Sequence, residues 1–295
     1  MLSKFLDPKN DYAFKRVFGS EKNKDILIHF LNDILDHQYI GQILEVTFLP
    51  TVQAPEVAAQ KQSIVDVLCQ DQRGVQYIVE IQVSATAGFE KRAQYYAAKA
   101  YSGQLFEGDD YNQLRAVIFL AITNFVMFPE KPAIKSDHII LDRATYEHDL
   151  KEFSFTFIEL PKFGKQIDEL LTIREKWYYY LKHAPETTHE AYGRLVKDAP
   201  ALKRAYDELE RFFWSAAELA RYEQVTKRDR DNASALLFQL QQAEQKGREE
   251  GKAEGMVLGK EYTKQSMARQ MLEEGAPIEK IVRWTGLSEE IMGKL

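Results

Sequence analysis

The chain contains one cysteine, Cys69, among its 295 residues. A single thiol excludes an intrachain disulfide and a cysteine cluster that would hold zinc. The six histidines, at positions 29, 37, 138, 148, 183 and 189, form no H-x-x-x-H pair or similar ligand spacing. The sequence therefore predicts that any bound metal is held by oxygen atoms.

Long hydrophobic runs are also missing. No segment approaches the roughly 18 consecutive apolar residues of a membrane span, and the first residues, "MLSKFLDPKND", lack the apolar stretch of a signal peptide. We therefore expect a cytoplasmic protein with no membrane partner.

The chain also lacks an excess of basic residues, since its net charge is −6. This total does not favour nucleic-acid binding, but affinity for a polyanion depends on local basic stripes more than on the sum. With 45% hydrophobic and 28% charged residues, the chain has the profile of a globular protein, which excludes disorder throughout.

Patterns along the chain predict helices and strands in the order α, β, β, β, α, β. Asp7 and Pro8 predict the start of a first helix, and an apolar stripe from Ile26 to Leu35 predicts a second. Strands are expected at 43–50, in a hairpin at 64–83, at 114–122, 138–142 and 153–160, and a helix at 88–107.

The rest of the chain is helical by composition, which leads to four expected segments. A glycine at every fourth position from Gly247 to Gly259 interrupts a charged run, and each such glycine costs a helix about 1 kcal/mol against alanine. We expect an α/β core at 1–165, a helical extension packed on it at 166–243, a charged linker or weak helix at 244–262, and a small helical module at 263–295.

The hairpin "IVDVLCQDQRGVQYIVEIQV" carries two carboxylates among its isoleucines and valines. A three-residue loop at 72–74, with Gly74 in the left-handed position, pairs Asp71 with Val75. Counting back along both strands, Asp66 then lies directly opposite Glu80. The register also places Val65, Val67 and Cys69 opposite Ile81, Val79 and Tyr77 as one apolar face.

Like charges at directly opposed positions of a sheet destabilise it. Two carboxylates on an open face can simply be solvated, and this alternative stays open from the spacing alone. Otherwise a shared proton or a divalent cation must compensate. Carboxylate oxygens favour Mg²⁺, Mn²⁺ or Ca²⁺ over zinc, and the backbone carbonyl of Ile81 is a further candidate ligand.

Several motifs occur together in this chain: "DPKNDYAFKRVFG", "DILIHFLNDIL", Asp66 with "EIQ" at 80–82, "KRAQYY", and "KGREEGKAEG" ahead of "TGLSEE". In this combination they resemble the Rpn family of recombination-promoting nucleases and putative transposases, of the PD-(D/E)XK nuclease superfamily. The resemblance implies a restriction-endonuclease-like αβββαβ core, with a mixed sheet flanked by helices, and a Mg²⁺-dependent DNA endonuclease, with Mn²⁺ as a substitute. It further implies low sequence specificity and a recombination, transposition-like or defence setting.

Carried over residue by residue, the resemblance makes Asp66 and Glu80 the metal ligands and puts Gln82 in the place of the superfamily's lysine. A neutral amide brings no positive charge to the reacting phosphate, although Gln82 can orient the attacking water. Lys15 and three residues of the 88–107 helix are candidate phosphate contacts, alongside the alternative that they are solvated: Lys91, Arg92 and Lys99.

The C-terminal module predicts two short helices around "TGLS". In a DNA-reading helix-turn-helix, Glu289 and Glu290 would meet the phosphates, which is electrostatically unfavourable. We therefore expect self-association through these helices, and a catalytically inactive nucleic-acid-binding or assembly protein remains the alternative function. The aromatic runs at 177–180 and 212–214 are expected to be packed in the core more than to stack on bases.

Overall fold

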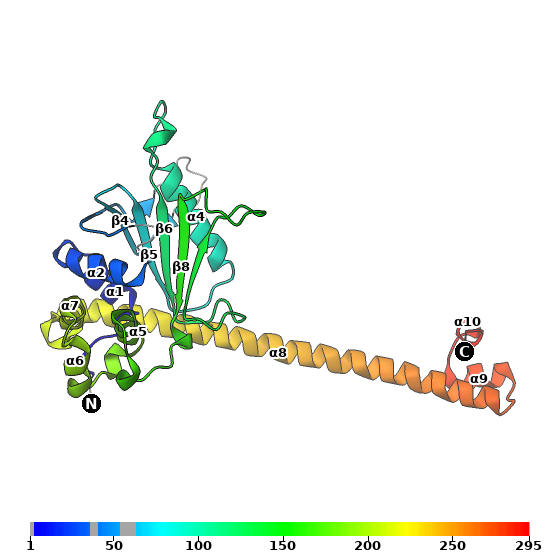
Figure 1. The fold of residues 1–295 in the computed structure, drawn as a ribbon. Helices are drawn as coiled ribbons and strands as arrows, with labels where there is room; N and C mark the ends of the chain where they lie inside the picture. The colour runs from blue at the N-terminus through cyan, green and yellow to red at the C-terminus, as the bar shows by residue number, and fades with distance from the viewer. Residues whose placement is uncertain (1–2, 36–40, 54–62, 295) are drawn as a thin grey trace. The chain divides into compact units, whose positions relative to one another are not determined.

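The computed structural model describes residues 3–35, 41–53 and 63–294 (Figure 1). The chain divides into two units, Met1–Arg230 and Asp231–Leu295, and each is described by itself. The segment boundaries expected at residues 165, 243 and 262 remain predictions.

The first unit is built on a six-stranded sheet in the order β1-β4-β5-β6-β8-β7. Its central pairs, β5 with β6 and β6 with β8, are parallel, and the outer pairs are antiparallel. The expected mixed sheet is therefore confirmed. The strands are β1 (Val46–Phe48), β4 (Val67–Asp71), β5 (Gln76–Gln82), β6 (Val117–Thr123), β7 (Lys135–Ile139) and β8 (Phe153–Glu159), with β2 (Val52–Gln53) and β3 (Ser63–Ile64) in a separate pair.

One face of this sheet is covered by helices from both ends of the unit. Val67, Val79 and Leu120 belong to a core cluster that also contains Phe30 and Trp177. The helices are α1 (Asp11–Phe18), α2 (Lys24–Ile34), α5 (Ile173–His183), α6 (His189–Val196) and α7 (Pro200–Leu209). The residues after 166 thus extend the core that the N-terminal helices begin, because α5 packs on α2 and α7 packs on both α1 and α2.

The first helix begins later than the sequence suggested. Asn10 is the N-cap, since its side chain accepts from the backbone N–H groups of Tyr12 and Ala13. Asp7 accepts instead from the N–H of Lys9 at 2.9 Å and closes the preceding turn. The prediction of Asp7 as the cap was wrong because two Asx residues three apart satisfy the same local rule.

The opposite face of the sheet is covered by α4 (Phe89–Ser102). Its buried residues Phe89, Ala93, Ala97 and Ala100 repeat at helical spacing, and they form a second cluster with residues such as Ile78 of the sheet. The alanines lie on the inner face of the helix and have short side chains, which lets it pack closely on the sheet.

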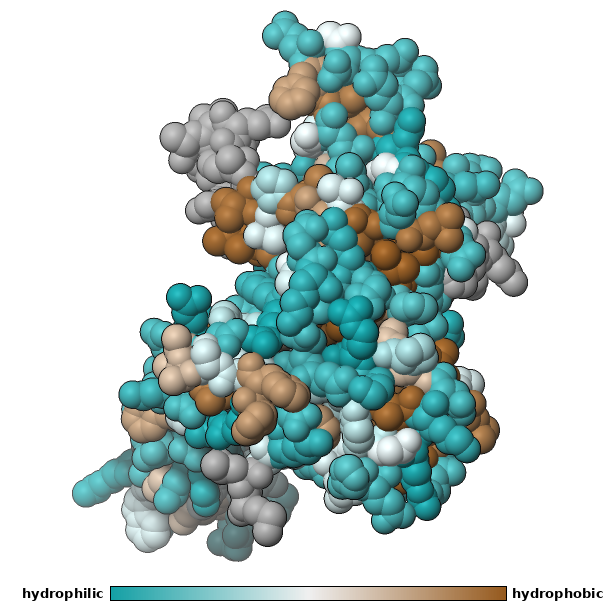
Figure 2. Space-filling model, turned by 90° about the vertical axis from the view of Figure 1, so that its left-hand side faces the viewer, coloured by the Kyte–Doolittle hydropathy of each residue, from teal (hydrophilic) through white to brown (hydrophobic). Residues whose placement is uncertain are grey.

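Short 3₁₀ helices connect these elements. They are η1 (Glu21–Asn23), η2 (Tyr111–Gln113), η3 (Leu160–Lys162), η4 (Ile167–Glu169), η5 (Ala184–Glu186) and η6 (Arg211–Phe213). The face drawn in Figure 2 is mostly hydrophilic, with its hydrophobic residues gathered in a few patches.

The two aromatic runs had different outcomes. Trp177, Tyr178 and Tyr180 are buried, as expected. Trp214 is buried too, but Phe212 and Phe213 are 86% and 62% exposed, so the prediction of core packing was wrong for these two. Periodicity cannot reveal this, because η6 turns both rings outward while Trp214 packs on Tyr12.

A long helix, α8 (Ala216–Glu273), contains the whole Gly-spaced segment. In the second unit α9 (Ile278–Thr285) and α10 (Glu289–Met292) follow it, and Ala268, Ile281 and Leu287 form a small core there. Within the described residues, no helix has both the length and the apolar character needed to cross a membrane.

Candidate active site

The hairpin pairs in the register that its turn predicts. Val67 lies opposite Val79, and Gln70 lies opposite Gln76. Gly74 has φ +83°, in the left-handed region where glycine is favoured. The N–H of Asp71 donates to the carbonyl of Val75 at 2.9 Å, which closes the three-residue loop. The predicted register is confirmed.

The regular strand breaks at Asp66, one residue before β4 begins. The N–H of Ile81 would ordinarily donate to a backbone carbonyl of the neighbouring strand, but it donates to Oδ2 of Asp66 at 3.0 Å. The N–H of Val65 bonds instead to the carbonyl of Thr51. Val65 therefore packs in the α4-side cluster, and its predicted place on the face of Val67 and Cys69 was wrong.

Two hydrogen bonds connect Asp66 to β5, one at Glu80 and one at Ile81. The N–H of Asp66 donates to Oε1 of Glu80 at 3.0 Å, while Asp66 accepts from the residue after Glu80. Glu80 is 6% exposed, and the side chain of Asp66 is 14% exposed. The two carboxylates are thus largely removed from water, and the alternative of an open, solvated pair is excluded.

Burial sets the protonation of this pair. Burial raises the pKa of Asp66 to about 6, against the hydrogen bond from Ile81 and the charge of Lys15, which both lower it. Burial, with the charge of Asp66 as the second cause, raises the pKa of Glu80 to about 8. Near neutral pH the pair therefore holds a proton that a cation would displace.

The backbone carbonyl of Ile81 faces the same side as the pair. Along a strand the N–H and C=O of one residue point to the same edge, and this edge alternates from residue to residue. The N–H of Ile81 points to Asp66, and the carbonyl of Gln82 points the other way, where it accepts from Asn124. The Ile81 carbonyl accordingly points to the edge where Asp66 lies.

Helix α1 brings Lys15 to the pair, together with a third carboxylate that the sequence reasoning missed. Lys15 Nζ lies 3.2 Å from Asp66 Oδ1 and 2.8 Å from Asp11 Oδ1. Burial would raise the pKa of Asp11, but hydrogen bonds with Lys15 and Asp66 outweigh it and lower the pKa. The missed signal was spacing, because Asp11 precedes Lys15 by four residues and so shares its helix face.

Gln82 is engaged at both ends of its amide. Its Nε2 donates to the carbonyl of Ser84 at 2.9 Å, and its Oε1 accepts from Nη2 of Arg92. The guanidinium of Arg92 also lies over the ring of Phe89, 4.8 Å from its centroid, and its charge lowers the pKa of Glu80 against the larger effect of burial. Gln82 thus holds a positive group near the acidic pair.

Arg92 keeps one unused donor: its Nε is buried and has no hydrogen-bond partner within the part of the chain that the structure describes. The other two candidates on α4 differ from it in position. Lys91 is exposed, and Lys99 follows Arg92 by seven residues, about 10 Å further along the helix axis.

The donor set suits a hard divalent cation. Among the described residues, no group of three or more His, Cys, Asp or Glu side chains is arranged to hold a metal. Mg²⁺ does not need such a cage, because it keeps several waters and is commonly bound through one or two carboxylates. Asp66, Glu80 and the Ile81 carbonyl supply oxygens of the kind it prefers.

The protein-family model described as PD-(D/E)XK nuclease family transposase matches residues 8–238 of the chain. The chain belongs to this family. The comparisons with curated proteins and with solved structures found no match. The matched range holds the complete sheet and every candidate site residue named above, so this nuclease-family chain has its acidic pair inside the region that defines the family.

Proposed function

We propose that this PD-(D/E)XK family protein is a metal-dependent DNA endonuclease of low sequence specificity. The observation that carries the proposal is the meeting of Asp66 and Glu80, which are buried and mutually repulsive, next to a backbone carbonyl and two basic side chains. A charge arrangement that costs stability without a cation is typical of a site built to bind one.

Asp66 and Glu80 would hold a divalent cation, with the Ile81 carbonyl as a third oxygen. Bound Mg²⁺, or Mn²⁺ as its substitute, lowers the pKa of a coordinated water and offsets charge on a phosphate oxygen. The protein's own residues then have separate tasks. Lys15 fixes the orientation of Asp66, and Asp11 fixes Lys15 from the other side.

Arg92 is the candidate group for the phosphate. Its guanidinium is only partly buried, so its outer N–H groups can donate to an anion while Nε itself is buried. Gln82 positions this guanidinium and so restores the positive charge that a lysine at position 82 would provide. Lys91 and Lys99 are proposed to contact DNA phosphates further from the acidic pair. Such contacts position the DNA without reading its sequence.

Plasmid nicking tests the proposal. The full-length protein is expected to nick supercoiled DNA with Mg²⁺ or Mn²⁺ and to stop when EDTA is added. Asp66→Asn and Glu80→Gln keep the side-chain shapes and remove the ligand charges, so each should lower nicking by at least a hundredfold. A Glu107→Gln variant, changed at an exposed position, is the matched control. Equal nicking by the parent and by all three variants would refute the proposed endonuclease activity at this site.

A second candidate function is an assembly protein that keeps the nuclease fold without its activity. It is favoured by the exposed apolar side chains on α8, among them Met256 at 56%, Val257 at 62% and Leu258 at 70%. Self-association would cover these residues. Light scattering of the full chain and of a chain without residues 244–295 tests this: equal association states would reject it.

A further inference from the structure

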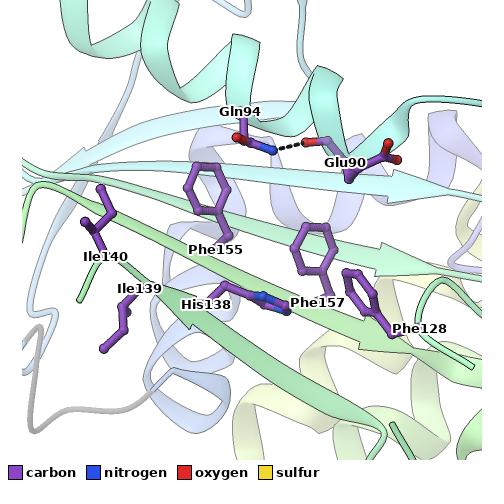
Figure 3. Close-up of a pocket in the computed structure, with 8 residues that line it drawn as sticks. All are labelled: Glu90, Gln94, Phe128, His138, Ile139, Ile140, Phe155 and Phe157. Carbon is purple, nitrogen blue, oxygen red and sulfur yellow. Dashed lines mark hydrogen bonds between the residues drawn. The ribbon is translucent and has the colours of Figure 1, made fainter. Parts of the chain in front are cut away.

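A pocket of about 300 Å³ opens between α4 and the β7–β8 edge of the sheet. Glu90 and Gln94 line the pocket from α4, and the rings of Phe155 and Phe157 of β8 lie below this helix (Figure 3). The carboxylate of Glu90 is exposed and is turned to one side of the rings. Phe128 and His138 close the lower side. The volume is at the small end of the range for ligand sites, and the apolar walls combine these four aromatic rings with the side chains of Ile139 and Ile140.

The rings form a connected set. Phe128 meets Phe157 edge-on at 5.4 Å between centroids, and His138 meets the same ring at 5.5 Å. Phe155 and Phe128 are each only partly buried. Aromatic rings bind another aromatic system by offset stacking or by edge contact.

The polar side chains that line the pocket disfavour a phosphate as its ligand, although the ammonium group of Lys131 lies 5.1 Å from the ring centroid of Phe128. Glu90 carries a carboxylate, which repels an anion. Burial, with the charge of Lys131, lowers the pKa of His138, so this imidazole is neutral at neutral pH. One nitrogen of the imidazole lies 3.1 Å from the Ser136 hydroxyl. The ligand that fits is a neutral ring with a hydrogen-bond donor for Glu90.

The pocket lies on the same sheet face as the acidic pair. Glu80 is the neighbour of Ala121, and Ala121 is the neighbour of Phe157, in one row across β5, β6 and β8. With strands about 4.8 Å apart, Phe157 is about 10 Å from Glu80, on the far flank of α4. That separation is on the scale of one or two nucleotides of an extended strand.

Resting on the proposed function, we propose that this pocket receives one unstacked nucleobase of the bound DNA, and that Glu90 accepts from its exocyclic amino group. Adenine, cytosine and guanine each carry an exocyclic amino group, whereas thymine carries none. Aromatic stacking holds any base, and the carboxylate adds the preference. The nuclease then has a base preference next to the cut without a sequence-reading element.

Binding of short single-stranded dA, dC and dT homopolymers tests the subsite in EDTA, where cleavage does not interfere. Fluorescence anisotropy should show dA and dC bound about fivefold or more tightly than dT. Glu90→Ala should abolish this difference. Lys91→Ala, at the neighbouring exposed position, should weaken all three homopolymers alike because it removes only a phosphate contact.

A second readout follows the bound base itself and tests its contact with the ring of Phe155. An oligonucleotide with 2-aminopurine should gain emission on binding to the parent protein, because the base leaves its stack, and should gain less with Phe155→Ala. Equal binding of the three homopolymers by the parent, or an unchanged preference in Glu90→Ala, would overturn the subsite. If the parent protein prefers dA and dC but nicks no plasmid, the endonuclease proposal is refuted and the base-binding subsite is supported. The two proposals can therefore fail separately.

Discussion

Replacing Glu80 with glutamine should make the metal-free protein more stable at alkaline pH. In the folded protein the pKa of Glu80 is raised from 4.5 to about 8, chiefly by burial and then by the charge of Asp66. The folded state therefore binds more protons than the unfolded state between these values. Stability is fully present below pH 4.5 and is lost as the pH rises towards 8.

The magnitude follows from the size of the shift. One pKa unit corresponds to 1.36 kcal/mol, so the free energy of unfolding should fall by about 3 to 4 kcal/mol between pH 5 and 8. Glutamine keeps an oxygen that can accept from the N–H of Asp66, but it cannot ionise. The Glu80→Gln variant should lose most of this slope and exceed the parent at pH 8.

Urea unfolding at several pH values, in EDTA, measures the slope directly. Glu107→Gln, at an exposed loop position, is the control and should follow the parent. A divalent cation at a hundred times its dissociation constant should raise the free energy of unfolding of the parent at pH 8 by about 2.7 kcal/mol. The same cation should leave the stability of Glu80→Gln unchanged. Identical slopes in parent and variant would show that the carboxylate is not held in the way described.

Three further substitutions test other parts of the structure. Lys15→Ala removes a charge that lowers the pKa of Asp66, so the pH at which nicking is half-maximal should move upward; an unchanged profile would contradict the contact at 3.2 Å. Gly74→Ala puts a Cβ at φ +83° and should cost about 1 to 2 kcal/mol in thermal unfolding, whereas Gly164→Ala, in open space, should cost less. Trp177→Ala empties a fully buried position and should cost about 3 to 5 kcal/mol in urea unfolding; a loss below about 1 kcal/mol would rule out the proposed packing.

The features that the sequence predicts well are those fixed by neighbouring residues. Gly74 and its loop determine the hairpin register, and this register puts Asp66 opposite Glu80 without any knowledge of the fold. The continuous apolar run around Ile118 is a buried strand, as its length and composition indicate. A period of two at Phe153, Phe155 and Phe157 likewise marks β8.

The features that escape prediction depend on contacts between distant segments. Val65 changes faces because a side chain takes over a backbone hydrogen bond, which no periodic pattern encodes. Asp11 joins the site because α1 brings it next to Asp66, which lies just before β4 and 55 residues later in the chain. Phe212 is exposed because of how a short turn projects it after α7 ends.

The neutral residue at position 82 is explained once its partner is known. A lysine there would bring its own charge, but it would also lie beside the buried Glu80 and hold it ionised by a fixed ion pair. Gln82 leaves that carboxylate protonatable and instead holds Arg92, whose charge comes from the neighbouring helix and whose Nε–H is still unused. In the proposed endonuclease the positive charge therefore comes from α4, on a planar guanidinium whose orientation Gln82 fixes, and not from a flexible ammonium group at position 82.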